Sequence, residues 1–430
     1  MKIATIGAGY VGLVTGVCFA DLGHEVICVD VMEDKVEKIN EGISPIYERD
    51  LDYMLKKNVG KRLIATTDLE YAVKNSEISF ICVGTPSRDD GRINLDYIRE
   101  ASRDVGKSLR DLGYHLVVVK SSVVPGTTEN LIIPEIEKYS GKNAGNDFGI
   151  CVNPEFLREG LAAEDTLNPD RIIIGEFDKK SGDILFNLYK KNFNCPILRT
   201  NLRTAEMIKY ASNNFLATKI SFINEISNIC QKLDIDVYEV ARGMGLDHRI
   251  GPHFLNAGVG FGGSCLPKDL KAMIKLSHDL GYEPKLLNSV LEINEKQKLK
   301  VIEIAKSIMD LNKKTVTILG LAFKPGTDDI RESPAITIVD KLLKENCKIK
   351  AYDPKAMENF EKINKKIYYA NSVDDALKDS DLCIILTEWD EFRDIYDKIL
   401  RMKNPRVIDG RRTLDGKKAM KLGIEYFSIY

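Results

Sequence analysis

The stretch Lys2-Ile-Ala-Thr-Ile-Gly7-Ala-Gly9-Tyr10-Val11-Gly12 decides how the N-terminal part of the chain folds. A short apolar run is followed by the pattern G-x-G-x-x-G, and this pattern opens a segment with helical spacing. In that context the first glycine makes a tight turn, the second lets the backbone approach a pyrophosphate, and the third lets helix and strand pack closely. We therefore predict a strand, a turn and a helix whose N-terminus binds a dinucleotide through Gly7, Gly9, Tyr10, Val11 and Gly12.

A carboxylate at the end of the next apolar run indicates which dinucleotide binds. Asp30 follows the run His24–Val29, where its carboxylate is placed to accept hydrogen bonds from a ribose 2′-hydroxyl. A carboxylate in this place repels a 2′-phosphate, so NAD is favoured over NADP. Lys35 lies a few residues further on and either reaches the cofactor or is a solvated helix charge.

The alternation of apolar runs with amphipathic segments predicts the domain organisation. Up to about residue 200 it is typical of βαβ units and a parallel sheet. Helical spacing without internal glycine or proline then predicts one long helix from Leu202 to Leu233. The alternation restarts near Lys313. The expected strands contain KIATI, HEVICV, ISFICV, HLVVVK, FGICV and RIIIG, and later TVTILGLAF, KIKAYDP, DLCIILT and RVIDGRR. We expect an α/β fold with two Rossmann-like, doubly wound lobes, residues 1–200 and 312–430, joined by a helical domain, residues 201–311.

The composition excludes several classes of protein. The 430 residues are 44% hydrophobic and 29% charged, which excludes collagenous and wholly disordered chains. Lysine and arginine number 62 and aspartate and glutamate 64, so the net charge of −2 attracts neither nucleic acid nor an anionic membrane. An anionic ligand must therefore be held by a local group of cations.

Targeting signals and cysteine usage indicate the compartment. The N-terminal residues meet Asp21 before any long apolar stretch, so we expect no secretory signal. No run approaches the roughly 18 apolar residues that span a bilayer. The nine cysteines form no C-x-x-C pair and mostly lie in apolar runs, as in a cytoplasmic protein with reduced thiols. None of the five histidines lies in a ligand-like cluster, so we expect no metal site.

Cys265 differs from the other cysteines. It follows the glycine-rich segment Asn256–Ser264 and precedes a segment of helical spacing with Pro267 near its start. A helix N-terminus and the neighbouring Lys268 both favour the thiolate, which is the nucleophilic form of cysteine. We therefore expect a nucleophile rather than an inert core thiol. In an NAD enzyme such a thiol suits a two-step oxidation, because an aldehyde gives up hydride only after a nucleophile has added to its carbon.

This chemistry also needs an oxyanion stabiliser, a base and an activated water. Lys209 and Asn213 are four residues apart on the expected long helix and share a face suited to holding a substrate oxygen. Glu155 and Glu159 follow the expected strand FGICV at its carboxyl end, where α/β proteins bind ligands. Taken singly, Lys209 and Glu159 fit solvated surface charges equally well.

The chain resembles the UDP-glucose/GDP-mannose dehydrogenase family almost from end to end. The resemblance rests on IGAGYVGLVTGVCFADLGHEVICVD, SPIYE, FICVGTP, NPEFLREG, AEMIKYASNNFLATKISFINEI, GVGFGGSCLPKDL, GLAFKPGTDDIRESPA and DGRR, which occur in the family's order. It implies an enzyme that passes two hydrides from a nucleotide sugar to two NAD⁺ in succession. The expected substrate is UDP-glucose and the expected product is UDP-glucuronate.

The resemblance also implies roles for individual residues. The implied catalytic residues are Cys265 (nucleophile), Asp269 and Ser122 (water), Lys209 and Asn213 (oxyanion and sugar) and Glu155 (substrate and thioester hydrolysis). The implied NAD contacts are Gly7, Gly9, Tyr10, Val11, Gly12, Asp30, Lys35, Thr85, Ser122, Glu159, Lys268 and Arg331. The implied substrate contacts are Glu155, Phe156, Leu157, Lys209, Asn213, Phe254, Leu255, Asn256, Ala257, Gly258, Phe261, Gly262, Lys324 and Arg411. Arg249 matches an arginine that the neighbouring subunit supplies in the family, which implies a homodimer or larger oligomer built around the long helix.

The chain departs from the family pattern at three places. Ser122 stands where threonine is common, which keeps the hydroxyl but fixes its orientation less. Val124 replaces a proline, and Arg49-Asp50 replaces Pro-Gly in a turn near the cofactor lobe.

Three other functions stay open on the sequence. A GDP-mannose or UDP-N-acetyl-sugar dehydrogenase would use the same chemistry, although the segment SCLPKD argues against the acetamido-sugar branch. A single-hydride dehydrogenase of the hydroxyacid type has a similar fingerprint but no use for Cys265. A non-catalytic protein that binds NAD or a nucleotide sugar would be indicated by loss of the nucleophile or the helix lysine, and this chain has both.

Overall fold

The computed structural model describes residues 1–429. Contacts within the chain divide it into two compact units, Met1–Ser212 and Asn213–Tyr430. Across the described residues, no helix is both long and apolar enough to cross a membrane.

The first unit contains an eight-stranded sheet with the order β3-β2-β1-β4-β5-β6-β7-β8. Neighbouring strands pair in parallel, except that β6 and β7 are antiparallel. The strands are β1 (Lys2–Ile6), β2 (Glu25–Val29), β3 (Leu63–Thr66), β4 (Ile78–Ile81), β5 (Leu116–Val119), β6 (Gly149–Val152), β7 (Ile172–Glu176) and β8 (Ile197–Asn201). The order 3-2-1-4-5-6 is that of the Rossmann fold, so the predicted lobe is confirmed.

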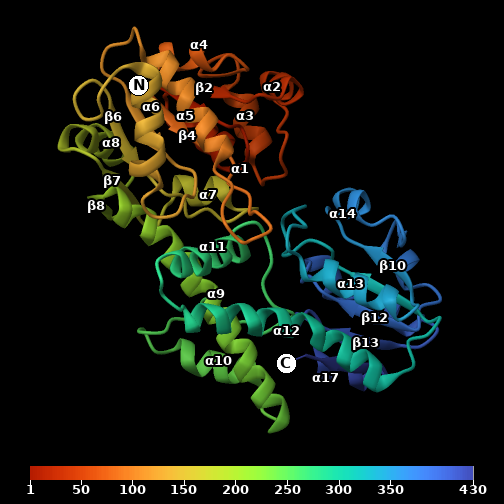
Figure 1. The fold of residues 1–430 in the computed structure, drawn as a ribbon. Helices are drawn as coiled ribbons and strands as arrows, with labels where there is room; N and C mark the ends of the chain where they lie inside the picture. The colour runs from red at the N-terminus through yellow and green to blue at the C-terminus, as the bar shows by residue number, and fades with distance from the viewer. Residues whose placement is uncertain (430) are drawn as a thin grey trace. The chain divides into compact units, whose positions relative to one another are not determined.

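Helices cover both faces of this sheet (Figure 1). They are α1 (Tyr10–Asp21), α2 (Glu33–Asn40), α3 (Leu51–Asn58), α4 (Leu69–Lys74), α5 (Asp96–Leu109), the π-helix η1 (Thr128–Ile132), α6 (Ile133–Ser140), α7 (Ala162–Leu167) and α8 (Lys179–Asn192). Successive residues of a strand point to opposite faces. In β5, Leu116 and Val118 therefore join a buried cluster with residues of α1, α3 and α8, whereas Val117 and Val119 join another with residues of α5 and α6.

The long helix predicted from Leu202 to Leu233 is α9 (Leu202–Lys232), and the division between the two units falls within it. The helices that follow are α10 (Val237–Gly245), α11 (Leu266–Asp279) and α12 (Lys285–Ile308). Small apolar clusters join α9 to this region, among them Ala217 with Phe261 and Leu270.

The second sheet, in the unit Asn213–Tyr430, is six-stranded and parallel, with the order β11-β10-β9-β12-β13-β14. Its strands are β9 (Thr315–Leu319), β10 (Lys348–Tyr352), β11 (Tyr368–Tyr369), β12 (Leu382–Ile385), β13 (Arg406–Asp409) and β14 (Glu425–Ser428). Its helices are α13 (Pro334–Lys344), α14 (Met357–Ile363), α15 (Val373–Leu377), the 3₁₀-helix η2 (Asp390–Phe392), α16 (Tyr396–Leu400) and α17 (Gly416–Lys421). In β12, Ile384 and Ile385 point into different buried clusters, so this sheet is also packed on both faces. Two Rossmann-like lobes joined by a helical region are thus confirmed.

Candidate active site

The turn after β1 forms an open cradle. Gly7 has φ +98° and donates its N–H to the Val29 carbonyl at 2.8 Å. A Cβ at Gly12 would lie 1.8 Å from the Gly7 carbonyl oxygen, so α1 packs this closely only with glycine there. A Cβ at Gly9 would meet no atom within 4 Å. Within residues 1–429 no side chain caps the first turn of α1. The backbone N–H groups at the start of a helix, beside open space, fit a dinucleotide pyrophosphate.

Replacing Gly12 by alanine is expected to damage this cradle specifically. The added Cβ pushes α1 away from the turn, and overpacking of this kind costs about 1–3 kcal/mol. We expect NADH to bind about tenfold more weakly or worse, which fluorescence titration measures. Gly113→Ala is the matched control, because a Cβ at Gly113 meets nothing within 4 Å. Equal NADH affinity in the two variants would contradict the proposed role of the cradle.

Asp30 lies directly after β2 and faces the same turn. Its carboxylate accepts the Ala8 N–H at 3.0 Å and the Met32 N–H at 3.1 Å, and Lys35 pairs with it at 3.5 Å. The structure thus brings the predicted ribose-binding residues Asp30 and Lys35 together beside the glycine turn.

The second lobe has a similar glycine turn, but protein hydrogen-bond donors occupy the carboxylate that follows its second strand. Gly320 has φ +96° and donates to the Tyr352 carbonyl, as Gly7 does to Val29. Asp353 corresponds to Asp30, but it is fully buried, and its carboxylate accepts five hydrogen bonds. The donors are the N–H groups of Leu321, Ala322, Lys355 and Ala356 and the indole of Trp389. With its carboxylate so occupied, Asp353 does not offer a ribose the acceptor that Asp30 offers in the first lobe.

Further predicted cofactor residues lie in loops at the carboxyl ends of the first sheet's strands. Thr85 is buried and donates its hydroxyl to the Ser122 carbonyl at 2.9 Å, so these two predicted residues are brought together. Glu159 is half-buried in the loop that precedes α7. Tyr10 donates its hydroxyl to the Tyr47 carbonyl at 3.0 Å.

Lys209 and Glu155 form a buried ion pair in the first unit. The Lys209 ammonium lies 2.8 Å from Glu155 Oε1, and both side chains are less than 10% exposed. The Leu157 N–H donates to the other Glu155 oxygen at 2.7 Å. Burial by itself raises the pKa of Glu155, but Lys209, the Leu157 N–H and Lys120 outweigh it, so the pKa is lowered. The ammonium of Lys209 also lies 5.4 Å from the centre of the Phe156 ring. The interpretation of Lys209 as a solvated surface charge is therefore wrong.

Cys265 is the N-cap residue of α11 and is half-buried. Pro267 lies in the first turn of this helix. The Ser264 hydroxyl is 3.6 Å from the Cys265 sulfur. The thiol therefore stands at the positive end of a helix dipole, which favours a thiolate.

Asp269, one turn into α11, is almost completely buried. Asn213 of α9 donates to one of its oxygens at 2.6 Å, and Lys268 pairs with the other at 2.6 Å. The structure thus joins Asn213, Asp269 and Lys268 in one polar cluster next to the start of α11. Lys268, expected to favour the Cys265 thiolate, is bound to this neighbouring carboxylate.

The glycine-rich loop before Cys265 is held by buried amides. Asn224 of α9 accepts the Gly258 N–H at 2.8 Å, and Gln297 of α12 donates to the Gly258 carbonyl at 2.9 Å. Asn294 of α12 bonds both the N–H and the carbonyl of Phe261. These three supports were not predicted from the sequence, since asparagine and glutamine at helical spacing resemble surface residues.

Other substrate contacts implied by the resemblance surround this loop. Leu255 and Ala257 are buried, Phe254 and Asn256 are exposed, and a Cβ at Gly262 would lie 2.4 Å from the Glu332 carbonyl. Arg411 donates to the Gly260 carbonyl at 2.9 Å and to the Leu386 carbonyl at 3.1 Å. A pocket of about 300 Å³ is lined by Asn256, Ala257 and Arg411 together with Tyr238, Glu388, Arg393, Arg412 and Thr413.

Three predicted cations lie away from this pocket. Arg331 pairs with Asp329 at 2.7 Å and is 58% exposed. Lys324 lies 5.6 Å from the centre of the Phe323 ring. Arg249 is 78% exposed and pairs with Asp247 at 2.6 Å. The backbone N–H of Arg249 also donates to Asp247, so these bonds of Arg249 go to a residue outside the predicted site.

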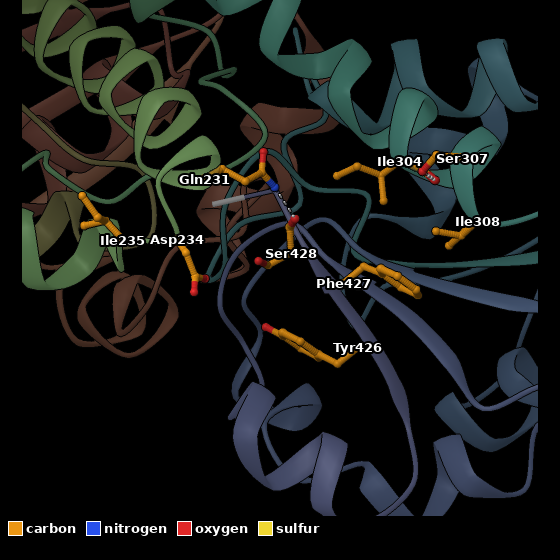
Figure 2. Close-up of a pocket in the computed structure, with 9 residues that line it drawn as sticks. All are labelled: Gln231, Asp234, Ile235, Ile304, Ser307, Ile308, Tyr426, Phe427 and Ser428. Carbon is orange, nitrogen blue, oxygen red and sulfur yellow. Dashed lines mark hydrogen bonds between the residues drawn. The ribbon is translucent and has the colours of Figure 1, made fainter.

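A second cavity of about 440 Å³ contains none of the predicted residues. It lies among the end of α9, the C-terminal half of α12 and the edge strand β14, where Figure 2 shows Gln231 donating to the Ser428 carbonyl. Its lining carries no cysteine, lysine or arginine, so the chemistry predicted from the sequence does not involve it.

A Rossmann lobe with an open glycine cradle and a carboxylate at the end of its second strand is typical of NAD-dependent dehydrogenases. Comparison with known proteins agrees at the level of the family. Models of the UDP-glucose/GDP-mannose dehydrogenase family match its NAD-binding domain to residues 1–193, its central domain to 203–296 and its UDP-binding domain to 317–416. The chain belongs to this family and is an NAD-dependent dehydrogenase.

Individual relatives carry three related names. A UDP-glucose 6-dehydrogenase of Haloferax volcanii is 43% identical over 100% of both chains. A UDP-glucose dehydrogenase structure from Pyrobaculum islandicum matches with a TM-score of 0.93 and 39% identity, over 99% of this chain and 97% of that one. A GDP-mannose dehydrogenase structure from Pseudomonas aeruginosa matches with a TM-score of 0.58 and 38% identity, over 100% of both chains.

Proposed function

We propose that the chain oxidises UDP-glucose to UDP-glucuronate, with two hydrides passed in succession to two NAD⁺. The observation that carries the proposal is the position of Cys265 at the N-cap of α11, next to the buried Asp269 cluster. NAD⁺, when bound, accepts hydride. A single-hydride dehydrogenase needs no nucleophile, so a thiol held in this way supports a second oxidation.

The first hydride leaves the C6 carbon of the sugar and its hydroxyl loses a proton, which gives an aldehyde. The Cys265 thiolate then adds to the aldehyde carbon and gives a thiohemiacetal oxyanion. This oxyanion collapses with loss of the second hydride and leaves a thioester. Water adds to the thioester carbon, the carbon–sulfur bond breaks, and the products are a carboxylate and the regenerated thiolate.

The buried polar groups supply the remaining proposed roles. Lys209 and Asn213 are one turn apart on α9 and stabilise the oxyanion. Asp269 and Ser122 position or activate water, and Glu155 contacts substrate and serves in thioester hydrolysis. The lowered pKa of Glu155 supports a role as an ionised acceptor of protons rather than as an acid.

For the nucleotide we propose the pocket that Arg411 and the Phe254–Gly258 loop line, in the UDP-binding domain of the family. Lys324 is proposed as a further cation for the diphosphate. For NAD we propose Gly7, Gly9, Tyr10, Val11, Gly12, Asp30, Lys35, Thr85, Ser122, Glu159, Lys268 and Arg331. The family ranges support three domains, residues 1–200, 201–311 and 312–430. Nine unbridged cysteines support a reducing compartment such as the cytoplasm.

GDP-mannose and UDP-N-acetyl-sugars are the alternative substrates. Sequence identity does not distinguish GDP-mannose from UDP-glucose as the substrate. The solved structures named for a UDP-glucose dehydrogenase and for a GDP-mannose dehydrogenase are 39% and 38% identical to this chain. NADH formation with equal concentrations of UDP-glucose, GDP-mannose and UDP-N-acetylmannosamine tests the choice. We expect kcat/KM to be highest for UDP-glucose, and a higher value for either other sugar would overturn the assignment.

We further propose a homodimer built around α9. Phe215, Phe222 and Ile229 recur every seven residues, so they share one helix face, and they are 64%, 42% and 50% exposed in the single chain. An exposed apolar stripe of this kind is typical of an interface between copies. A partner would also supply Arg249, as the resemblance implies.

Phe222→Asp is expected to convert the dimer to monomers and to lower turnover with it, since the charge enters the centre of the proposed interface. Sedimentation velocity measures the first effect and NADH formation the second. Tyr53→Asp is the control, because Tyr53 lies on α3 and is already 73% exposed. A Phe222→Asp protein with unchanged mass in solution would refute the interface.

A further inference from the structure

Lys120 is a buried lysine that the proposed mechanism does not use. It follows β5 directly and is 8% exposed. Its ammonium donates to Asn153 Oδ1 at 2.9 Å, and the Tyr189 hydroxyl donates to the same oxygen. The Asn153 amide nitrogen donates to the Ile173 carbonyl at 2.8 Å. Lys120 therefore fixes the side chain that opens the turn leading to Glu155.

The charges around Lys120 link it to the ion pair of Glu155 and Lys209. The groups that act on its ammonium are Cys82 at the end of β4, Glu155 and Lys209. Burial raises the pKa of Cys82 to about 12, so that thiol is neutral near neutral pH. Glu155, which pairs with Lys209 at 2.8 Å, is then the anion that acts on the charge of Lys120. Burial and Lys209 lower the pKa of Lys120, and Glu155 opposes them.

A second ammonium group near the Glu155–Lys209 pair has a consequence for the reaction. With Lys209 alone, the pair would be neutral, and an oxyanion would compete with Glu155 for the same ammonium. A second cation leaves a net positive charge in the cluster. Glu155 then stays ionised while Lys209 donates to the substrate.

We propose that Lys120 is a positioning residue that fixes the Asn153–Glu155 turn and supplies the second cation that keeps Glu155 ionised. This rests on the proposed function for its effect on turnover, but the ionisation of Glu155 is a property of the protein without substrate. The role of Lys120 and the proposed oxidation of UDP-glucose can therefore be refuted independently.

The test compares Lys120→Met, which removes the charge, with Tyr189→Phe, which removes a neutral donor to the same Asn153 oxygen. For Lys120→Met we expect kcat with UDP-glucose to fall about tenfold to a hundredfold, with KM within about threefold of wild type. Losing a nearby cation raises the pKa of a carboxylate, so the acid limb of kcat against pH should move to higher pH. Tyr189→Phe should leave that limb in place.

Infrared difference spectra, wild type minus Glu155→Gln, report the protonation of Glu155 directly and need no turnover. The same difference in the Lys120→Met background should show the protonated carboxyl band persisting to higher pH. Lys120→Gln keeps a donor for Asn153 without the charge and should behave like Lys120→Met. An unmoved carboxyl band in either folded Lys120 variant, or an equal shift in Tyr189→Phe, would overturn the proposal. An inactive wild type with the expected band shift would instead refute the proposed function alone.

Discussion

Cys265→Ser is expected to stop the formation of UDP-glucuronate, lowering turnover by at least about 10³-fold. Serine at an N-cap is a good helix start but a poor nucleophile near neutral pH, because its hydroxyl is not ionised. The first hydride transfer does not use the thiol, so some aldehyde and NADH should still form. Rapid mixing of the variant with UDP-glucose and NAD⁺ should show at most one NADH per site and no acid product.

Cys195→Ser is the matched control for this variant. Cys195 is also half-buried, but it belongs to the first lobe and lies outside the proposed site. We expect the control to turn over like wild type. Full glucuronate production by Cys265→Ser would remove this residue from the role of nucleophile.

Lys209→Met is expected to lower kcat by about 10²–10³-fold, the range for loss of a single oxyanion donor. The substitution also leaves Glu155 buried without its nearest cation, at 2.8 Å in the wild type, and breaking such a pair costs about 3–5 kcal/mol. The pair stabilises the fold above the ordinary pKa of glutamate, and this contribution is lost as pH falls through the lowered pKa of Glu155. Loss of activity and loss of stability must therefore be measured separately.

The double variant Lys209→Met/Glu155→Gln separates them. It removes both charges, so no uncompensated carboxylate remains, and the thermal midpoint should return toward that of wild type. Turnover should stay low, because the oxyanion donor is still absent. Recovery of turnover together with stability would show that Lys209 acts only by supporting the fold.

The interior of both sheets could be predicted from the sequence, whereas the edges could not. Every strand missed by the apolar runs is an edge strand: β3 and β8 in the first sheet, β11 and β14 in the second. Strands covered on both faces read as continuous apolar runs. Edge strands such as β8 are half-exposed and polar, as its sequence ILRTN shows, and therefore carry no such signal.

The site residues also divide into those that the sequence could predict and those that it could not. Local patterns located the glycine turn, Asp30, the thiol at a helix start and the lysine on α9. Local patterns did not predict the hydrogen bonds that join segments far apart in the sequence. Glu48, in the segment SPIYE, accepts the N–H groups of Gly160 and Ala162 at 2.7 and 2.8 Å, and Glu206 accepts those of Gly126 and Thr128.

These buried charged residues could not be predicted, because a single carboxylate or lysine in a sequence cannot be distinguished from a surface charge. Only folding reveals that Glu48, Glu206 and Lys120 are each less than 10% exposed. The neighbouring residues do indicate the position of Lys120, since it directly follows a run of valines that ends a buried strand. A charge in that position lies at the carboxyl edge of the sheet, where ligands bind.

The stoichiometry of the complete reaction distinguishes an oxidation in two steps from an oxidation in one. Limiting UDP-glucose is consumed by the wild-type protein with excess NAD⁺, and NADH is counted by absorbance while the sugar product is identified by mass. Two NADH per UDP-glucose, with UDP-glucuronate as the product, is the predicted result. One NADH per sugar with an aldehyde or ketone as the final product would refute the two-step oxidation.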